Sequence, residues 1–248
     1  MIKYALQIVC SSLSDIQRAS RSGADCFELA GCWTTGGVTP SPGQIRAAIA
    51  STDKPLDVVI RPREGHLVYS ASEQKVILED AAWCIEQGAS RVTVGGLNSD
   101  LRFDFKLLDS ILAEIPPHRI SVGRALDCAK MPDDVIRKLA DRNIAAIGTS
   151  AGQSSAIKGI KKLSEWASDS KLKDIELYAA GNLLPQGVGH LWEAGLRYFK
   201  ASARKSGGMA HEIRWFEGEI YIVDARRVER LADRLQSLYQ EELDKAAQ

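Results

Sequence analysis

The chain has 248 residues, of which 45% are hydrophobic and 26% charged, so it contains enough apolar material for a large core. Its 32 basic and 32 acidic residues cancel, which argues against binding to nucleic acid or to an anionic membrane. No apolar run approaches the length of a membrane span, and the N-terminus lacks the pattern of a secretory signal. Five cysteines without Cys-x-x-Cys spacing favour free thiols in a reducing compartment. We therefore expect a cytoplasmic protein that binds neither nucleic acid nor membrane.

Short apolar segments alternate with amphipathic ones along the chain. The first strand is expected at Ala5–Cys10, and a helix follows at residues 14–22, just before Gly23. Further strands are expected at 26–29, from Leu56 up to Pro62, and at 91–94, 120–122, 145–147, 175–179 and 198–201. The helices between them are expected to end near residue 51 and to span 72–87, 105–115, 132–140, 157–167 and 188–194. A short segment at 218–223 precedes a closing helix that begins near Ala225.

This alternation predicts an α/β fold of the (β/α)8 TIM-barrel type. Eight expected strands, each followed by a helix, fit one domain spanning residues 1–248, and no disordered linker interrupts the series. A doubly wound open sheet is the alternative. No Gly-x-Gly-x-x-Gly motif follows the first strand, so no nucleotide cofactor is implied.

Polar residues gather where the expected strands end, and in such barrels the functional site lies at the C-terminal strand ends. The expected catalytic residues are Glu28, Arg61, Arg124 and Asp127. The expected substrate-binding residues are Arg63, Thr149, Ser150, Gly181, Asn182, Lys200 and Ser202. Charges at strand ends are costly unless they are paired or solvated, so the pattern predicts a polar pocket. Lys200 could be a Schiff-base lysine or an anion clamp; a solvated surface lysine is the ordinary alternative.

The segment around Pro62 is the most informative single stretch. Pro62 favours an extended backbone at Arg61, and residues two apart in an extended chain share a face. Arg61 and Arg63 are therefore expected to point the same way and to bind a carboxylate or phosphate. The alternative is that they bind structural carboxylates such as Glu28.

Thiols form a second candidate site. Cys10 and Cys32 are the expected metal ligands, with Cys128 as a possible third, because all three lie at or just beyond strand ends. Soft thiolates favour Cu(I), which accepts two or three of them. Cysteine is also a common small buried hydrophobe. The four histidines lack the spacing of a zinc site.

Several motifs together resemble the CutC copper homeostasis family. They are Gly23-Ala24-Asp25, Glu28-Leu29, Gly36-Gly37-Val38-Thr39-Pro40-Ser41, Ile60-Arg61-Pro62-Arg63, Tyr69-Ser70, Ile77-Leu78-Glu79-Asp80, Arg124-Ala125-Leu126-Asp127, Thr149-Ser150, Ala180-Gly181 and Tyr221-Ile222-Val223-Asp224. The resemblance implies a TIM-barrel-like fold, a cytoplasmic location, oligomerisation, and a role in Cu(I) binding and copper tolerance. The chain departs from the family pattern at Gly123 and Lys200, where histidine is usual, at Gln7, where glutamate is usual, and at Ala30, where cysteine is usual.

Two hypotheses follow. The first is a CutC-like protein that handles Cu(I) through Cys10 and Cys32 at the barrel rim. The second is a lyase, isomerase or hydrolase for a small anionic or sugar-like substrate. In it, Glu28 is the general acid or base, and Arg61, Arg63 and Arg124 orient the ligand. Either protein is expected to form a homo-oligomer, with a dimer favoured.

Overall fold

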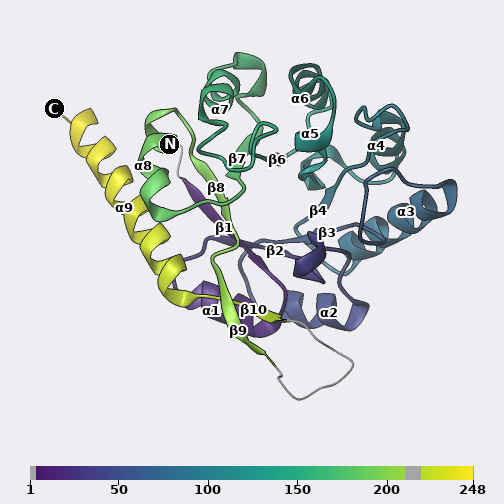
Figure 1. The fold of residues 1–248 in the computed structure, drawn as a ribbon, viewed down its shortest axis with the longest axis horizontal. Helices are drawn as coiled ribbons and strands as arrows, with labels where there is room; N and C mark the ends of the chain where they lie inside the picture. The colour runs from purple at the N-terminus through teal and green to yellow at the C-terminus, as the bar shows by residue number, and fades with distance from the viewer. Residues whose placement is uncertain (1–3, 210–218, 248) are drawn as a thin grey trace.

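A computed structural model describes residues 4–209 and 219–247 as a closed eight-stranded parallel barrel (Figure 1). The strands are β1 (Ala5–Cys10), β2 (Cys26–Leu29), β3 (Leu56–Val59), β4 (Arg91–Val94), β5 (Ile120–Val122), β6 (Ala146–Thr149), β7 (Glu176–Ala180) and β8 (Tyr198–Ala201). They pair in chain order, and β1 pairs with β8 to close the ring. The predicted (β/α)8 fold is confirmed.

Helices connect the strands around the outside of the barrel. They are α1 (Leu13–Arg21), α2 (Pro42–Ala50), α3 (Ala71–Glu86), α4 (Phe105–Leu112), α5 (Ala125–Cys128), α6 (Pro132–Ala140), α7 (Ile160–Ala167), α8 (Pro185–Glu193) and α9 (Ala225–Ala246), with short 3-10 turns at Trp33–Thr35, Pro117–Arg119 and Ser170–Leu172. Side-chain caps explain several of their starts. Ser12 accepts from the backbone of Asp15 at α1, and Ser70 forms a capping box with Glu73 at α3.

Most expected elements match these bounds within two residues. β3 ends at Val59 and does not reach Pro62, α4 ends at Leu112 and not at residue 115, and the short helix α5 was not expected. α7 begins at Ile160, because residues before it form turns, and α8 begins earlier than expected, at Pro185. A strand at β9 (Arg204–Met209) was not expected; it pairs antiparallel with β10 (Glu219–Val223) to form a hairpin outside the barrel. Gly207 and Gly208 lie within β9, and glycine is depleted in strands, so the local sequence gave little sign of it. Residue 218 of the expected segment lies outside the described residues.

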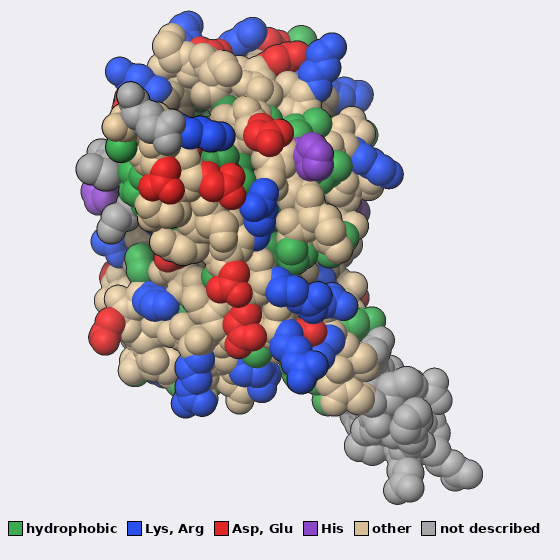
Figure 2. Space-filling view, turned by 90° about the vertical axis from the view of Figure 1, so that its left-hand side faces the viewer, with side chains coloured by type: hydrophobic (Ala, Val, Ile, Leu, Met, Phe, Trp, Pro, Cys, Tyr) green, Lys and Arg blue, Asp and Glu red, His purple; other side chains and the backbone are tan. Residues whose placement is uncertain are grey.

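The long helix α9 covers one side of the barrel. It packs along α8 and also contacts α1 and β1, burying Val228, Leu231, Leu235 and Leu238 (Figure 1). The Tyr4 hydroxyl donates to Gln236 at 2.8 Å beside this contact. On the face shown in Figure 2, basic and acidic side chains are interspersed without a broad patch of one sign. None of the helices in the described ranges is long and apolar enough to cross a membrane.

Candidate functional site

A cavity of about 340 Å³ opens at the C-terminal end of the barrel. Its lining comes from strand ends and from the loops after β2, β3, β4 and β5: Glu28, Thr35, Gly36, Val59, Ile60, Arg61, Gly65, Leu67, Tyr69, Thr93, Val94, Gly95, Gly123, Arg124, Ala125, Cys128, Gly148 and Lys200. Four of the predicted site residues, Glu28, Arg61, Arg124 and Lys200, thus surround one space. Three of these are cations and one is a carboxylate, which favours an anionic occupant.

The most deeply buried charges of the cavity are Glu28 and Lys200. Lys200 Nζ donates to Glu28 Oε1 at 2.6 Å, and the Thr93 hydroxyl donates to the same oxygen at 2.8 Å. Glu28 is 7% exposed and Lys200 8% exposed. The side chains come from β2, β4 and β8, so the pair spans the inside of the barrel. A carboxylate and an amine at this distance can exchange a proton, which is the requirement for acid–base chemistry on a bound molecule.

Two glycines make room for the side chains of Lys200 and Thr93 and for the part of the cavity beside them. A Cβ atom at Gly148 on β6 would lie 3.0 Å from Lys200 Nζ and 3.3 Å from its Cε. A Cβ atom at Gly123, which follows β5, would lie 3.0 Å from the Cγ2 of Thr93. Both residues line the cavity. The missing side chains at these two positions therefore form part of the hollow.

Arg61 belongs to the cavity wall but also holds the loop after β2. Its Nη1 donates to the carbonyls of Thr35 and Gly37, each at 2.9 Å, and its Nη2 donates to the carbonyl of Gly65 at 2.6 Å. The alternative, that the two arginines bind structural carboxylates such as Glu28, does not hold for Arg61, because its partners are backbone carbonyls. Its first role is therefore to shape the mouth of the cavity.

Two polar atoms in the wall lack a hydrogen-bond partner within the described residues: the Tyr69 hydroxyl and Arg61 Nε. Tyr69 is only 8% exposed, and burial raises the pKa of its hydroxyl although the charges of Arg61 and Arg63 oppose the rise. A side-chain interaction with Arg61 also lowers the pKa of Tyr69, so Arg61 Nε is not free of this hydroxyl. Because buried polar groups normally have partners, the O–H of Tyr69 is the donor that suits a ligand acceptor. Tyr69 was named only within a family motif and not as a site residue, because the path of a loop cannot be predicted from local sequence.

Arg124 and Asp127 are paired by the single turn of α5. Their side chains form an ion pair, and Arg124 Nη2 also donates to the Ser150 hydroxyl at 3.1 Å. Arg124 is 52% exposed and lines the cavity, whereas Asp127 is buried and lies outside the lining. The Asp127 carboxylate instead accepts from the Thr149 hydroxyl and from backbone N–H groups of Ser150 and Gly152. Asp127 thus fixes the turn after β6 and positions Arg124.

The remaining predicted substrate-binding residues lie outside this cavity. Thr149 and Ser150 are fully buried against Asp127. At Gly181, a Cβ atom would lie 2.8 Å from Arg124 Nη1, so this glycine makes room for the arginine. Asn182 and Ser202 line a separate small cavity of about 80 Å³ beside the start of α8.

Arg63 also lies outside the cavity, contrary to the expectation that it points with Arg61. Its Nε donates to Glu73 Oε1 at 2.5 Å, and its other nitrogens donate to the carbonyls of Glu64, His66 and Val68. β3 ends at Val59, so the alternation of faces does not extend to residues 61–63. Arg63 instead ties the loop to the start of α3.

The three rim cysteines do not share one environment. Cys10 is fully buried in the hydrophobic core, and burial raises the pKa of its thiol well above the usual value. Cys32 and Cys128 are exposed, and Cys128 lines the cavity. No group of three His, Cys, Asp or Glu side chains within the described ranges is arranged to hold a metal. Of the two expected ligands, only Cys32 is accessible to Cu(I).

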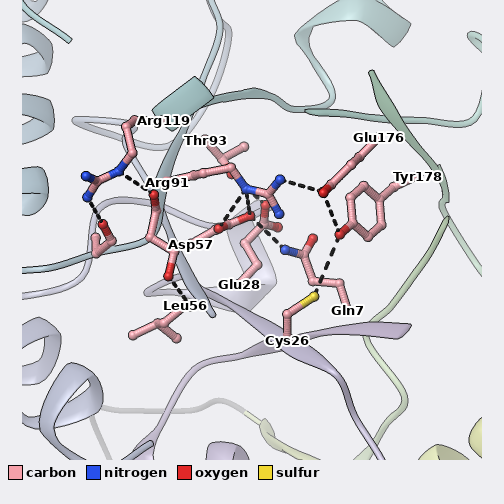
Figure 3. Close-up of polar contacts among 12 residues, drawn as sticks. Gln7, Cys26, Glu28, Leu56, Asp57, Arg91, Thr93, Arg119, Glu176 and Tyr178 are labelled. Carbon is pink, nitrogen blue, oxygen red and sulfur yellow. Dashed lines mark hydrogen bonds and ion pairs between the residues drawn. The ribbon is translucent and has the colours of Figure 1, made fainter. Parts of the chain in front are cut away.

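Below the cavity, a polar network fills the barrel interior (Figure 3). Asp57 accepts from Gln7 Nε2 at 2.8 Å and from Arg91 Nε at 3.1 Å, and Arg91 Nη1 donates to Glu176 at 2.5 Å. The Tyr178 hydroxyl donates to Glu176 at 3.1 Å. Desolvation raises the pKa of Asp57, against the opposing charges of Arg91 and Lys200. This network was not expected from the sequence; a charged residue inside the short apolar run of β3 was its one visible sign.

The comparisons with known proteins agree with this architecture. The model of the CutC family matches residues 4–205. A copper homeostasis protein, CutC, from Streptococcus agalactiae is similar in structure, with a TM-score of 0.70 and 20% identity over 80% of this chain and 98% of that one. KGPDC from Streptococcus mutans superposes with a TM-score of 0.61 and 13% identity over 96% of this chain and 100% of that one. Phosphoribosyl anthranilate isomerase from Thermus thermophilus superposes with a TM-score of 0.58 and 12% identity over 94% of this chain and 99% of that one. Identities this low show a shared fold alone.

Proposed function

The chain belongs to the CutC family, and from that premise we propose a copper-homeostasis-related protein whose barrel mouth binds and converts a small anionic molecule. The observation that carries the proposal is the contact of 2.6 Å between Lys200 Nζ and Glu28 Oε1 in the cavity. A buried charge pair beside an open cavity is a common arrangement of acid–base sites. The reaction class is that of a lyase, isomerase or hydrolase.

In this proposal, some residues of the cavity transfer protons and others bind the ligand. Glu28 and Lys200 exchange protons with the ligand, and Thr93 orients the Glu28 carboxylate through its hydrogen bond. Arg124, half exposed in the wall, attracts the anionic group. The Tyr69 hydroxyl supplies a donor that the described part of the protein leaves unsatisfied.

The test is ligand-dependent thermal stabilisation, measured with inorganic phosphate and with small carboxylates. We expect millimolar ligand to raise the melting temperature of the wild type but not of Arg124→Gln. Arg21→Gln, which changes an exposed arginine on α1, is the matched control and keeps the effect. Tyr69→Phe keeps the melting temperature of the free protein and weakens binding by about 2- to 10-fold, the loss of one hydrogen bond. Failure of every anion to stabilise the wild type, or equal binding by Arg124→Gln, would contradict the proposal.

Cu(I) handling is the second candidate, favoured by the accessible thiols. Cys128 lines the cavity, and Cys32 precedes Thr35 and Gly36 of its wall. Two thiolates suffice for Cu(I). An anaerobic Cu(I) titration against a chromophoric competitor tests this, with Cys32→Ser/Cys128→Ser as the variant and buried Cys10→Ser as its control. Tight stoichiometric binding lost only in the double variant supports copper handling; weak binding that no substitution changes counts against it.

The expected homodimer and cytoplasmic location stay predictions, and both belong to this proposal. Analytical ultracentrifugation of the purified protein tests the first.

A further inference from the structure

We propose that Lys200 forms a Schiff base with a small carbonyl compound that carries an anionic group, such as a 2-oxo acid. The inference rests on the proposed anion site and names its substrate class. It starts from the surroundings of the Lys200 amine, which differ from those of a surface lysine.

The amine is held in a nearly dry position that opens on the cavity. Within the part of the chain that the structure describes, Nζ has one hydrogen-bond acceptor, Glu28 Oε1. The Tyr178 ring centroid lies 5.7 Å from Nζ on another side. Gly148 provides the space directly beside Nζ, since its missing Cβ would lie only 3.0 Å away. The amine therefore has a base beside it and open room in front of it, as a nucleophilic lysine requires.

Glu28 can carry every proton transfer of Schiff-base formation. It first accepts a proton from the Lys200 ammonium, which frees the nitrogen lone pair. The nitrogen attacks the carbonyl carbon; a C–N bond forms, and the π electron pair moves to oxygen, which takes the proton back from Glu28. The nitrogen of the carbinolamine then loses a second proton to Glu28, which passes it to the hydroxyl group. Water leaves with the electrons of the C–O bond, and the nitrogen lone pair forms the iminium C=N bond. An ammonium and a carbonyl thus give an iminium ion and water, with no oxidant or reductant.

The cavity wall supplies recognition for the anionic part of the same molecule. Arg124 presents a half-exposed guanidinium, and the Tyr69 hydroxyl is a buried donor without a partner in the described residues. Lys200, Arg124 and Tyr69 all line one cavity of about 340 Å³, which is suited to a small ligand. A carbonyl group at Lys200 with a carboxylate toward Arg124 satisfies both parts of the site.

The test is reductive trapping of the wild-type protein with pyruvate and cyanoborohydride, followed by peptide mass spectrometry. We expect a single adduct on Lys200, formed much faster than any adduct on Lys205, a 51% exposed lysine of β9. Acetone, which lacks the carboxylate, is expected to label Lys200 at least 10-fold less. Arg124→Gln is expected to remove this difference between pyruvate and acetone.

Two variants separate chemistry from folding. Lys200→Arg keeps a cation beside Glu28 but cannot form the iminium, so it loses the adduct; Glu28→Gln keeps the amine but slows labelling. If neither variant folds, the position of the adduct in the wild-type protein still shows whether Lys200 forms the Schiff base. Equal labelling of Lys200 and Lys205, or no labelling of Lys200, overturns the Schiff base. If pyruvate stabilises the protein through Arg124 but forms no adduct, the Schiff base is overturned and the anion site is supported. If pyruvate neither stabilises the protein nor forms an adduct, both proposals are contradicted.

Discussion

Asp57 and Arg91 are paired neighbours on β3 and β4, and their side chains meet inside the barrel with Arg91 Nε 3.1 Å from Asp57 Oδ1. Asp57 is 1% exposed and the side chain of Arg91 11% exposed, so neither charge is stabilised by bulk water. Removal of Asp57 leaves Arg91 with Glu176 as its remaining carboxylate partner, and removal of Arg91 leaves the Asp57 carboxylate buried with the Gln7 amide as its hydrogen-bond donor. The pair therefore holds the lower barrel together, directly below the cavity.

We expect Asp57→Asn to lower the free energy of unfolding by about 2–3 kcal/mol, because Glu176 still compensates part of the Arg91 charge. The matched control is Asp109→Asn, which breaks the more exposed ion pair with Arg142 and should cost about 1 kcal/mol or less. Chemical denaturation of the two variants measures both values. An equally small decrease in the free energy of unfolding in both variants would show that the interior pair does not stabilise the fold.

The strand ends could be located from the sequence, but the directions of side chains could be predicted only within the regular strands. Glu28 and Lys200 lie in regular strands, where alternation of faces holds, and both reach the cavity as expected. Arg63 lies beyond the end of β3, where alternation no longer applies, and Glu73 from the next helix determines its position. Asp127 was expected in the pocket but lies in α5, whose turn aims it at backbone N–H groups.

The missed parts of the site depend on tertiary contacts. Tyr69 reaches the cavity through a loop, and Gly148 matters only because Lys200 lies against it. The positions of Cys10 and Cys32 after strands predicted that both lie at the barrel rim. Cys10, at the end of β1, is buried in the core, whereas Cys32, in the loop after β2, is exposed. The family motifs identify the fold reliably because they fix strands and turns; they do not report which side chains face each other.

Gly148→Ala tests the shape of the cavity floor. The added methyl group would lie 3.0 Å from Lys200 Nζ, so the amine must shift by a few tenths of an ångström, its contact with Glu28 is disturbed, and ligand binding should weaken. Gly43→Ala is the control, because a Cβ there meets no atom within 4 Å and alanine favours the helix by roughly 0.5–1 kcal/mol. Calorimetric titration with the anion that stabilises the wild type measures the difference. Unchanged affinity in Gly148→Ala would place the ligand away from Lys200.

The five cysteines should divide into two reactive and three protected thiols. Burial raises the pKa of Cys26 and of Cys84 to about 12 and that of Cys10 well above its usual value, so these thiols stay protonated at neutral pH. Cys32 and Cys128 are exposed. Reaction with a chromogenic disulfide should therefore release two equivalents quickly in the native protein and five after unfolding. Because Cys128 lines the cavity, a bound anion should slow one of the two fast reactions.

The last prediction concerns pH and the start of α3. Hydrogen bonds from the Ser70 backbone and from Arg63 lower the pKa of Glu73 from 4.5 to about 2. A carboxyl whose pKa is lower in the folded state stabilises that state above the unfolded value and loses this contribution as the pH falls. The contribution of Glu73 to the free energy of unfolding is thus complete above about pH 4.5 and declines toward pH 2, whereas its bonds to Arg63 and to the cap of α3 persist in the folded protein until the carboxyl is protonated near pH 2. Carboxyl NMR titration should show Glu73 ionised at pH 3.5. Arg63→Gln should raise the titration midpoint of Glu73 but leave it below 4.5, since the hydrogen bond from the Ser70 backbone remains. A midpoint near 4.5 in the wild-type protein would mean that Arg63 does not tie the loop to α3.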